Sequence, residues 1–296
     1  SISSNTNINT TISHSINNGI VCGSDDYVGG FVGGAYDNTN MSMTISNSTI
    51  NGTVIGSGQF VGGFVGYISS NTGMIVTISN STNNGTVTGS RDAGGFTGTI
   101  SSNTNMTMTV SNCTNYGNVT VKSSNAGGFV GYIYNNGNMT MTVSHSMNIG
   151  ITTVKWYCAG GFIGYIYNNA NVTITISDST SDRIATWANM YVGEFVAHIY
   201  KNTDMIVLIL NSIINGNATE GSFNVGGFAG YISSNTNIVT TISNSINNGI
   251  VQGRQQVGGI VGIIINNTNI TTTISNYHQW QYHWERLQSG WVCWAH

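Results

Sequence analysis

The chain has 296 residues, with 39 glycines and no proline, and only 6% of its residues are charged, against about 25% in an ordinary soluble domain. The net charge of −3 argues against nucleic-acid binding through phosphate neutralisation, which requires clustered lysine and arginine. No apolar run approaches the roughly 18 residues that span a bilayer.

One sequence unit repeats along almost the whole chain. A Gly-Gly-Phe-Val-Gly segment, or a close variant, recurs every 32 or 33 residues and begins at Gly29, Gly62, Gly94, Gly127, Gly160, Gly193, Gly226 and Gly258. A Thr-Ile-Ser-Asn-Ser segment recurs with the same spacing and places its Ile or Val at Ile12, Ile45, Ile78, Val110, Val143, Ile176, Ile209, Ile242 and Ile274. A fixed period of this length is typical of solenoids and other repeat architectures.

Within one repeat the pattern predicts three short strands, at residues 61–68, 74–81 and 86–88. The second has the alternation of a half-buried strand, with Met74, Val76 and Ile78 on one side. Asn83-Asn84-Gly85 predicts a corner, because Asn and Gly tolerate positive φ. No helical period is present, so the sequence predicts an all-β protein.

A parallel β-solenoid, or β-helix, accounts for these strands better than a propeller. A propeller blade takes about 40–50 residues and four strands, whereas this repeat supplies 33 residues and three strands. The sequence therefore predicts about nine coils of 32–33 residues stacked about 4.8 Å apart. Right-handed winding is expected, as for parallel β connections in general. The lack of proline fits, because proline would remove a donor from the ladder of backbone hydrogen bonds.

Stacking in register would place like side chains above one another in ladders. The sequence predicts a phenylalanine ladder of Phe31, Phe64, Phe96, Phe129, Phe162, Phe195 and Phe228, continued by Ile260. It predicts an amide ladder of Asn47, Asn80, Asn112, Asn211, Asn244 and Asn276, with His14, His145 and Asp178 as variants. Gly62, Gly63 and Gly66 are expected where the backbone bends or where coils approach closely.

The repeat pattern occupies residues 1–276, which we expect to be one solenoid domain and a fragment of a longer array, because the sequence begins partway through a repeat. Residues 277–296 leave the pattern and contain four of the six tryptophans. One choice of codons for them, read one base later, encodes another copy of the repeat, so the sequence predicts a frameshifted repeat here. A cofactor or metal site built from these Trp and His residues is the alternative.

The segments Gly-Gly-Phe-Val-Gly, Ile-Ser-Asn-Ser and Asn-Gly-Thr-Val-Thr-Gly together resemble the GLUG motif, across essentially all of residues 1–276. Phe replaces the usual Leu, and the Asn/Ser/Thr loop is longer. The resemblance implies a secreted or surface-attached, adhesin-like β-solenoid stalk. It is specific for architecture rather than for an activity.

Candidate binding residues gather where the repeat departs most from its consensus. They are Asp182, Arg183, Trp187, Glu194, His198, Lys201 and Asp204. A carbohydrate-binding or carbohydrate-cleaving face is one interpretation, and drift within one repeat is the other. Neither the His residues nor the four Cys residues have a metal-site or disulfide-framework spacing, so no metal, cofactor or catalytic residue is predicted.

Two further surface functions are open from the residue pattern. Candidate glycosylation sites in Asn-x-Ser/Thr sequons include Asn40, Asn51, Asn84, Asn105, Asn118, Asn138, Asn171, Asn217 and Asn269. Columns of threonine, which include Thr77, Thr109 and Thr142, resemble ice-binding surfaces, although Ile75, Ile206 and Val239 interrupt the second column.

The sequence thus predicts a non-enzymatic structural or adhesive repeat protein at the cell surface or outside the cell. Its predicted partners are further copies of itself, joined end to end or laterally into filaments because unpaired strand edges promote association, together with glycans or host and cell surfaces. No nucleic-acid partner and no membrane-spanning segment is expected in this part of the chain. A carbohydrate-binding or carbohydrate-cleaving β-helix and an ice-binding solenoid are the alternatives.

Overall fold

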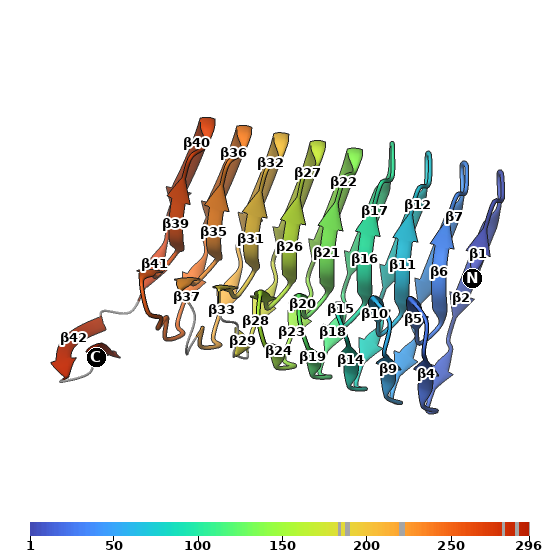
Figure 1. Ribbon diagram of the computed structural model, residues 1–296, viewed down its shortest axis with the longest axis horizontal. Helices are drawn as coiled ribbons and strands as arrows, with labels where there is room; N and C mark the ends of the chain where they lie inside the picture. The colour runs from blue at the N-terminus through green and yellow to red at the C-terminus, as the bar shows by residue number, and fades with distance from the viewer. Residues whose placement is uncertain (183–184, 187–189, 219–222, 280–281, 288–289, 296) are drawn as a thin grey trace.

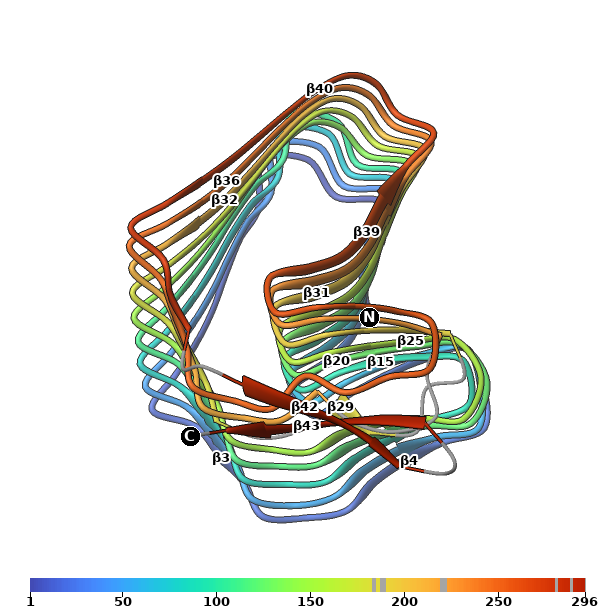
Figure 2. The ribbon, with the colours of Figure 1, turned by 90° about the vertical axis from the view of Figure 1, so that its left-hand side faces the viewer.

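The computed structural model describes residues 1–182, 185–186, 190–218, 223–279, 282–287 and 290–295, and this part of the chain is all β with no helix. Successive turns of the chain lie side by side from one end to the other (Figure 1). In Figure 2 the chain circulates counterclockwise as it advances toward the viewer, so the coil is right-handed. The predicted parallel β-solenoid is confirmed.

The turns form five parallel sheets, which we number I to V in chain order, and six turns contribute a strand to sheet V. Sheet I contains β5 (Tyr27–Gly29), β10 (Phe60–Gly62), β15 (Asp92–Gly94), β20 (Asn125–Gly127), β25 (Cys158–Gly160), β30 (Tyr191–Gly193), β34 (Asn224–Gly226) and β38 (Gln256–Gly258). Sheet II contains β1 (Ile2–Ser3), β6 (Val32–Tyr36), β11 (Val65–Ser69), β16 (Thr97–Ser101), β21 (Val130–Tyr134), β26 (Ile163–Tyr167), β31 (Val196–Tyr200), β35 (Ala229–Ser233) and β39 (Val261–Ile265).

Sheet III is formed by the longest strands of the repeat, and sheets IV and V by shorter ones. Sheet III contains β2 (Asn9–Ser13), β7 (Ser42–Ser46), β12 (Ile75–Ser79), β17 (Thr107–Ser111), β22 (Gly137–Ser144), β27 (Ala170–Ser177), β32 (Thr203–Leu210), β36 (Thr236–Ser243) and β40 (Thr268–Ser275). Sheet IV contains β3 (Ile16–Asn17), β8 (Thr49–Ile50), β13 (Thr82–Asn83), β18 (Thr114–Asn115), β23 (Met147–Asn148), β28 (Thr180–Ser181), β33 (Ile213–Ile214), β37 (Ile246–Asn247) and β41 (His278–Gln279). Sheet V contains β4 (Val21–Gly23), β9 (Val54–Gly56), β14 (Val87–Gly89), β19 (Val119–Val121), β24 (Thr152–Val154) and β29 (Ala185–Thr186).

The strand content of a turn differs from the prediction of three strands. The expected strand at 61–68 is two strands, β10 and β11, because the chain turns sharply at Gly63 and Phe64. An added Cβ at Gly63 would lie 2.0 Å from the carbonyl oxygen of Gly95 in the next turn, so a side chain fits here only if the backbone shifts. The close approach expected at this glycine is therefore confirmed. The expected corner at Asn83 contains the additional two-residue strand β13.

The register is that of a regular coil of 32 or 33 residues. In sheet III, Thr77 pairs with Thr44 below it and with Thr109 above it, and all strand pairs of the five sheets are parallel. Nine strands stack in sheets II, III and IV, so eight full turns separate the first strand of each sheet from the ninth. The predicted period and the stacking of like residues on like are both confirmed.

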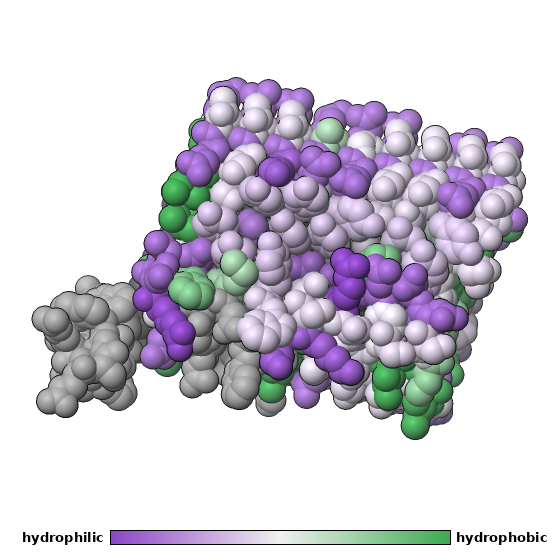
Figure 3. Space-filling model, in the orientation of Figure 1, coloured by the Kyte–Doolittle hydropathy of each residue, from purple (hydrophilic) through white to green (hydrophobic). Residues whose placement is uncertain are grey.

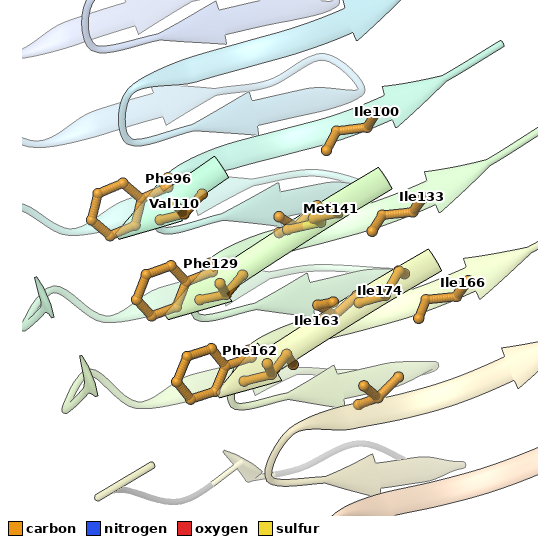
Figure 4. Packing of buried hydrophobic residues seen from close by; sticks show 14 of the residues in the cluster. Phe96, Ile100, Val110, Phe129, Ile133, Met141, Phe162, Ile163, Ile166 and Ile174 are labelled. Carbon is orange, nitrogen blue, oxygen red and sulfur yellow. The ribbon is translucent and has the colours of Figure 1, made fainter. Parts of the chain in front are cut away.

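The phenylalanine ladder forms the centre of the core. Ring centroids of consecutive members from Phe64 to Phe228 lie 4.6–5.3 Å apart with nearly parallel planes, and these rings are fully buried. Figure 4 shows Phe96, Phe129 and Phe162 above one another beside the apolar side chains of sheets II and III. Burying a ring of this size in each turn supplies roughly 2–3 kcal/mol of hydrophobic stabilisation per turn.

The interior also contains an amide ladder, at a column that lies between the strands predicted at 61–68 and 74–81. Its members occupy the corner between sheets II and III and are Asn5, Asn38, Asn71, Asn103, Asn136, Asn169, Asn202, Asn235 and Asn267. The Nδ2 of each donates to the Oδ1 of the next at 2.9–3.1 Å, and the seven from Asn38 to Asn235 are buried.

The asparagine column that was expected to form the amide ladder lies on the surface instead. Asn47, Asn80, Asn112, Asn211 and Asn244 are exposed, and all five have φ between 48° and 52°. His14, His145 and Asp178 share this backbone conformation. The column is therefore selected for a left-handed corner, which Asn, Asp and His tolerate, rather than for an interior hydrogen bond.

The parallel stack continues slightly beyond the predicted boundary at Asn276, because β41 still pairs with β37. The residues that follow form an antiparallel hairpin of β42 (Tyr282–Leu287) and β43 (Gly290–Ala295). The change from parallel to antiparallel pairing coincides with the loss of the sequence repeat. The frameshift hypothesis for 277–296 stays a prediction.

Candidate functional site

A second aromatic cluster lies outside the main core, where sheet I folds back beneath sheet II (Figure 2). We call it the tyrosine face and define it by its ring-bearing residues, which are Tyr27, Tyr36, Phe60, Tyr67, Tyr132, Tyr134, Tyr157, Tyr165, Tyr167, Tyr191, His198, Tyr200 and Tyr231. Figure 3 shows this side of the molecule, and its middle is mainly white and pale purple, without a broad apolar patch.

The rings form rows because neighbouring turns place them in register. Tyr132 stacks on Tyr165 with 5.1 Å between ring centroids, and Tyr165 stacks on His198 at 4.7 Å. A parallel row runs from Tyr167 to Tyr200 at 5.7 Å. The sequence signal for these rows is the Tyr-x-Tyr pattern of β21, repeated 33 residues later in β26, which the sequence analysis did not use.

The rows are interrupted at the third turn. Asp92 takes the position of Phe60, and Thr99 takes the position of Tyr67 and Tyr132. Asn125, directly above Asp92, donates a 2.8 Å hydrogen bond from Nδ2 to the Oδ1 of that carboxyl. Asp92 and Thr99 are fully buried and Asn125 is 4% exposed. The second carboxyl oxygen, the threonine hydroxyl and the asparagine Oδ1 have no hydrogen-bond partner among the described residues.

Burial determines the protonation of Asp92. Loss of solvent raises the pKa of its carboxyl from 3.8 to about 7, and the hydrogen bond from Asn125 and the charge of Arg91 lower it only in part. The Arg91 guanidinium bonds instead to the Gln59 side chain at 2.6 Å. Below neutral pH the carboxyl is therefore neutral in the folded chain.

His198 is the other titratable group inside the tyrosine face. Its ring is 2% exposed and lies 4.4–4.9 Å from the rings of Tyr165, Tyr191 and Tyr231. Burial lowers its pKa from 6.5 to about 3, and both ring nitrogens lack a hydrogen-bond partner among the described residues. The imidazole is neutral and packs as an aromatic ring in place of the tyrosine of neighbouring turns.

The three acids near the most divergent turn occupy three separate surface ladders of asparagine. Asp178 accepts a hydrogen bond from Asn211 at 3.1 Å. Asp182 accepts one from Asn215 at 2.6 Å, and Asp204 accepts one from Asn237 at 2.8 Å. In other turns the same ladders pair two amides, as Asn84 and Asn51 do at 2.8 Å. Each acid therefore replaces an amide oxygen as acceptor, at three different corners of the coil.

Glu194 lies in the interior rather than on a binding surface. It replaces the second glycine of the Gly-Gly corner, and its carboxylate accepts a 2.7 Å hydrogen bond from the Ser181 hydroxyl. Both residues are fully buried. Ser181 itself replaces the interior asparagine of Asn115 and Asn148. In other turns an asparagine side chain places its amide at this position. Here Ser181 is too short to do so, and the carboxylate of Glu194 supplies the polar group instead.

We expect Glu194 and Ser181 to be energetically coupled. Glu194→Gly should destabilise the chain because it removes the acceptor of a buried hydroxyl, and Ser181→Asn alone should crowd the carboxylate. The double variant restores the consensus pair, so it should be more stable than the sum of the single effects predicts by about 1–3 kcal/mol. Guanidinium unfolding of the four proteins measures this coupling, and strict additivity would contradict it.

The structure therefore does not gather the predicted divergent residues into one surface. Lys201 and Asp204 are exposed, with the ammonium of Lys201 5.1 Å from the Tyr200 ring centroid, whereas Glu194 and His198 are buried. Arg183 and Trp187 lie outside the described residues.

The sequon asparagines lie on the surface. Asn40, Asn51, Asn84, Asn105, Asn118, Asn138, Asn171 and Asn269 are exposed, and Asn217 is half-buried. Several belong to surface ladders, as Asn138 does between Asn105 and Asn171. Glycosylation stays a prediction.

The threonine columns of sheet III also face outward and are half-buried at Thr77, Thr109 and Thr142. Exposed Ile75, Ile206 and Val239 interrupt them, at 51%, 40% and 39% exposure.

Among the described residues, no three His, Cys, Asp or Glu side chains are grouped as metal ligands. Cys22 is exposed, Cys113 and Cys158 are buried, and all three are free thiols. Within the same ranges there is no helix of the length and apolarity that crossing a bilayer requires.

Comparison with known proteins returns no matching family model, no matching curated protein and no matching solved structure.

Proposed function

We propose that this chain is a non-enzymatic structural or adhesive protein that acts as a stiff spacer at a cell surface or outside the cell. The resemblance of its repeat to the GLUG motif belongs to this proposal, as does self-association into filaments. The observation that carries it is the unbroken register of the parallel stack, in which each 33-residue turn repeats the hydrogen bonds and ladders of the last.

Such a stack suits a spacer because its length is set by the number of turns. Each turn adds one strand separation, about 4.8 Å, along the axis. Bending requires the backbone bonds of several sheets to stretch together, so the rod is stiffer than an extended linker of the same length. A low content of charged residues in a chain rich in Asn, Ser and Thr also limits non-specific attraction to charged surfaces.

Inserting further copies of residues 107–139, one complete turn, tests this function. One, two and four inserted copies should lengthen the particle by about 4.8 Å each in small-angle X-ray scattering. Beads coated with the chain by its N-terminal end should then hold a C-terminal ligand at a distance from the surface that rises in the same steps. A maximum dimension that does not grow with the number of copies would contradict the proposal.

Carbohydrate binding is a second candidate function, and the tyrosine face is the observation that favours it. Half-buried Tyr134, Tyr167 and Tyr200 repeat on three consecutive turns, and aromatic rings with hydroxyl tips present both apolar and hydrogen-bonding surface. Binding to a glycan array should then be lost in Tyr167→Ala with Tyr200→Ala. Binding should be retained in the double variant Asp182→Ala, Asp204→Ala. Binding that is lost in this double variant and kept in the tyrosine double variant would exclude the tyrosine face as the site.

A further inference from the structure

Two pairs of tyrosines in the tyrosine face have the same geometry five turns apart. Tyr27 stacks on Tyr67 with 4.5 Å between ring centroids and 3° between ring planes. Tyr191 stacks on Tyr231 with 4.6 Å and 9°. In each pair a residue of sheet I meets the residue of sheet II that lies 40 positions later, in the next turn of the coil.

The same relation does not produce a tyrosine pair in the intervening turns or in the next one. In two of these turns the sheet I residue and the sheet II residue of the next turn are Phe60 with Thr99 and Cys158 with His198. The remaining combinations are Asp92 with Tyr132, Asn125 with Tyr165, and Asn224 with Ile263. Among the described residues between 27 and 263, this relation therefore brings two phenols into ring contact at two places, one near each end of the stack.

We propose that Tyr27–Tyr67 and Tyr191–Tyr231 are sites of oxidative dityrosine cross-linking, with a peroxidase and hydrogen peroxide as the oxidant. Each phenol loses one electron and one proton to give a phenoxyl radical. The two radicals join by a carbon–carbon bond between ring positions ortho to the hydroxyls, and the two ortho hydrogens move to the oxygens to restore both phenols. Hydrogen peroxide accepts the two electrons and two protons and leaves as two water molecules.

Exposure favours these two pairs over the pair of Tyr132 and Tyr165. Tyr27 is 41% exposed, and Tyr67, Tyr191 and Tyr231 are half-buried, so the oxidant can reach one side of each pair. Tyr165, which stacks on Tyr132, is only 7% exposed. Its buried hydroxyl would have to release its proton without solvent, and burial raises the pKa of Tyr165 further than that of Tyr191.

A cross-link at either site would covalently join two turns of the coil. It closes a loop of about 40 residues, and closing such a loop restricts the unfolded chain as a disulfide does. The solenoid contains no disulfide among its three described cysteines, so these bonds would supply a covalent connection between turns that it otherwise lacks.

The test treats dilute chain with a haem peroxidase and limiting hydrogen peroxide, then follows dityrosine fluorescence and maps linked peptides by mass spectrometry. The expected result is intrachain Tyr27–Tyr67 and Tyr191–Tyr231 peptides. Tyr67→Phe should remove the first and Tyr231→Phe the second, because phenylalanine keeps the stack but has no phenol. Tyr116→Phe is the matched control, since Tyr116 is 53% exposed and is expected to leave both links unchanged.

The unfolding midpoint gives an independent readout. Oxidised wild-type chain should unfold at a higher guanidinium concentration than reduced chain, and oxidation should not shift the Tyr67→Phe, Tyr231→Phe double variant. Dityrosine that joins only separate chains would overturn the proposal. So would intrachain fluorescence that survives in full in the double variant.

Discussion

Asp92→Asn should stabilise the chain by about 4 kcal/mol at pH 8 and leave its stability almost unchanged at pH 4. The wild-type carboxyl has a pKa of about 7 in the folded chain and 3.8 when it is fully solvated. Between these values the folded state holds a proton that the unfolded state has released, so the contribution of this carboxyl to stability falls as pH rises and stays low above pH 7. Asparagine has the same shape without the charge, so this loss disappears.

Guanidinium unfolding of both proteins between pH 4 and pH 9 measures the difference. Asp182→Asn is the matched control, because Asp182 is only half-buried and accepts a hydrogen bond from Asn215 on the surface. Its stability should follow the wild-type curve within about 0.5 kcal/mol. Parallel pH profiles for wild type and Asp92→Asn would show that the carboxyl is solvated.

His198 should give the opposite slope. Its pKa falls from 6.5 to about 3 on folding, so between these values the unfolded state binds a proton that the folded state excludes. The contribution of His198 to the free energy of unfolding is fully present above pH 6.5. It is lost as pH falls toward 3, by about 1.4 kcal/mol per pH unit. Asp92 and His198 therefore nearly cancel between pH 4 and 6.5, and His198→Tyr should uncover a decline in stability from pH 4 to 7.

Asn136→Ala should destabilise the chain by about 4 kcal/mol, because it removes one member of the interior amide ladder. The Asn136 Oδ1 accepts from both the backbone N–H and the Nδ2 of Asn103 at 3.0 Å. Its Nδ2 donates to the carbonyls of Ile100 and Tyr134 and to the Oδ1 of Asn169. The deletion leaves several of these groups buried without a partner, each at a cost of about 1–3 kcal/mol.

Asn51→Ala is the matched control, since Asn51 makes the same amide-to-amide bonds with Asn18 and Asn84 at 2.7 and 2.8 Å, but in contact with water. Water replaces those bonds, so its effect should stay within about 0.5 kcal/mol. Chemical denaturation of both variants compares the two ladders. Equal effects would mean that burial does not distinguish them.

The course of the chain around a turn could be predicted only in part. Residue spacing fixed the period and the parallel register, because every copy of Thr77 or Phe96 returns at the same place. The division of 61–68 into two strands could not be found from alternation, since Gly62, Gly63 and Gly66 carry no side chain to reveal which way the backbone faces. The corner depends on close backbone contact with the next turn, which is a property of the stack.

The two amide ladders show the limit more clearly. Surface and interior asparagines look alike in one copy, so the local sequence does not separate the column of Asn80 from that of Asn103. Across copies the interior column of Asn103 is asparagine at all nine positions, whereas the surface column admits His14, His145 and Asp178. The presence of His and Asp in the Asn80 column was therefore the sign in the sequence that this column lies on the surface.

The candidate site was the least predictable feature. Clustered departures from the repeat suggested a surface around residues 182–204, but departure from a consensus does not tell whether a residue is inside or outside. Glu194 is explained by its contact with Ser181, and His198 by its stacking among tyrosines, and both contacts require the neighbouring turn. The tyrosine face itself arises from residues that follow the repeat rather than break it.

Spin-label distances along one surface column test the stacking of turns most directly. Labels on cysteines placed at Asn80 and Asn211, four turns apart, should lie about 19 Å apart, and labels at Asn47 and Asn244, six turns apart, about 29 Å. Cys113 can be replaced by Ser, the residue at its position in neighbouring turns, and the other native cysteines by Ala. A distance that rises by about 4.8 Å with each turn is the predicted result. Distances that do not scale with the number of turns would contradict the in-register solenoid.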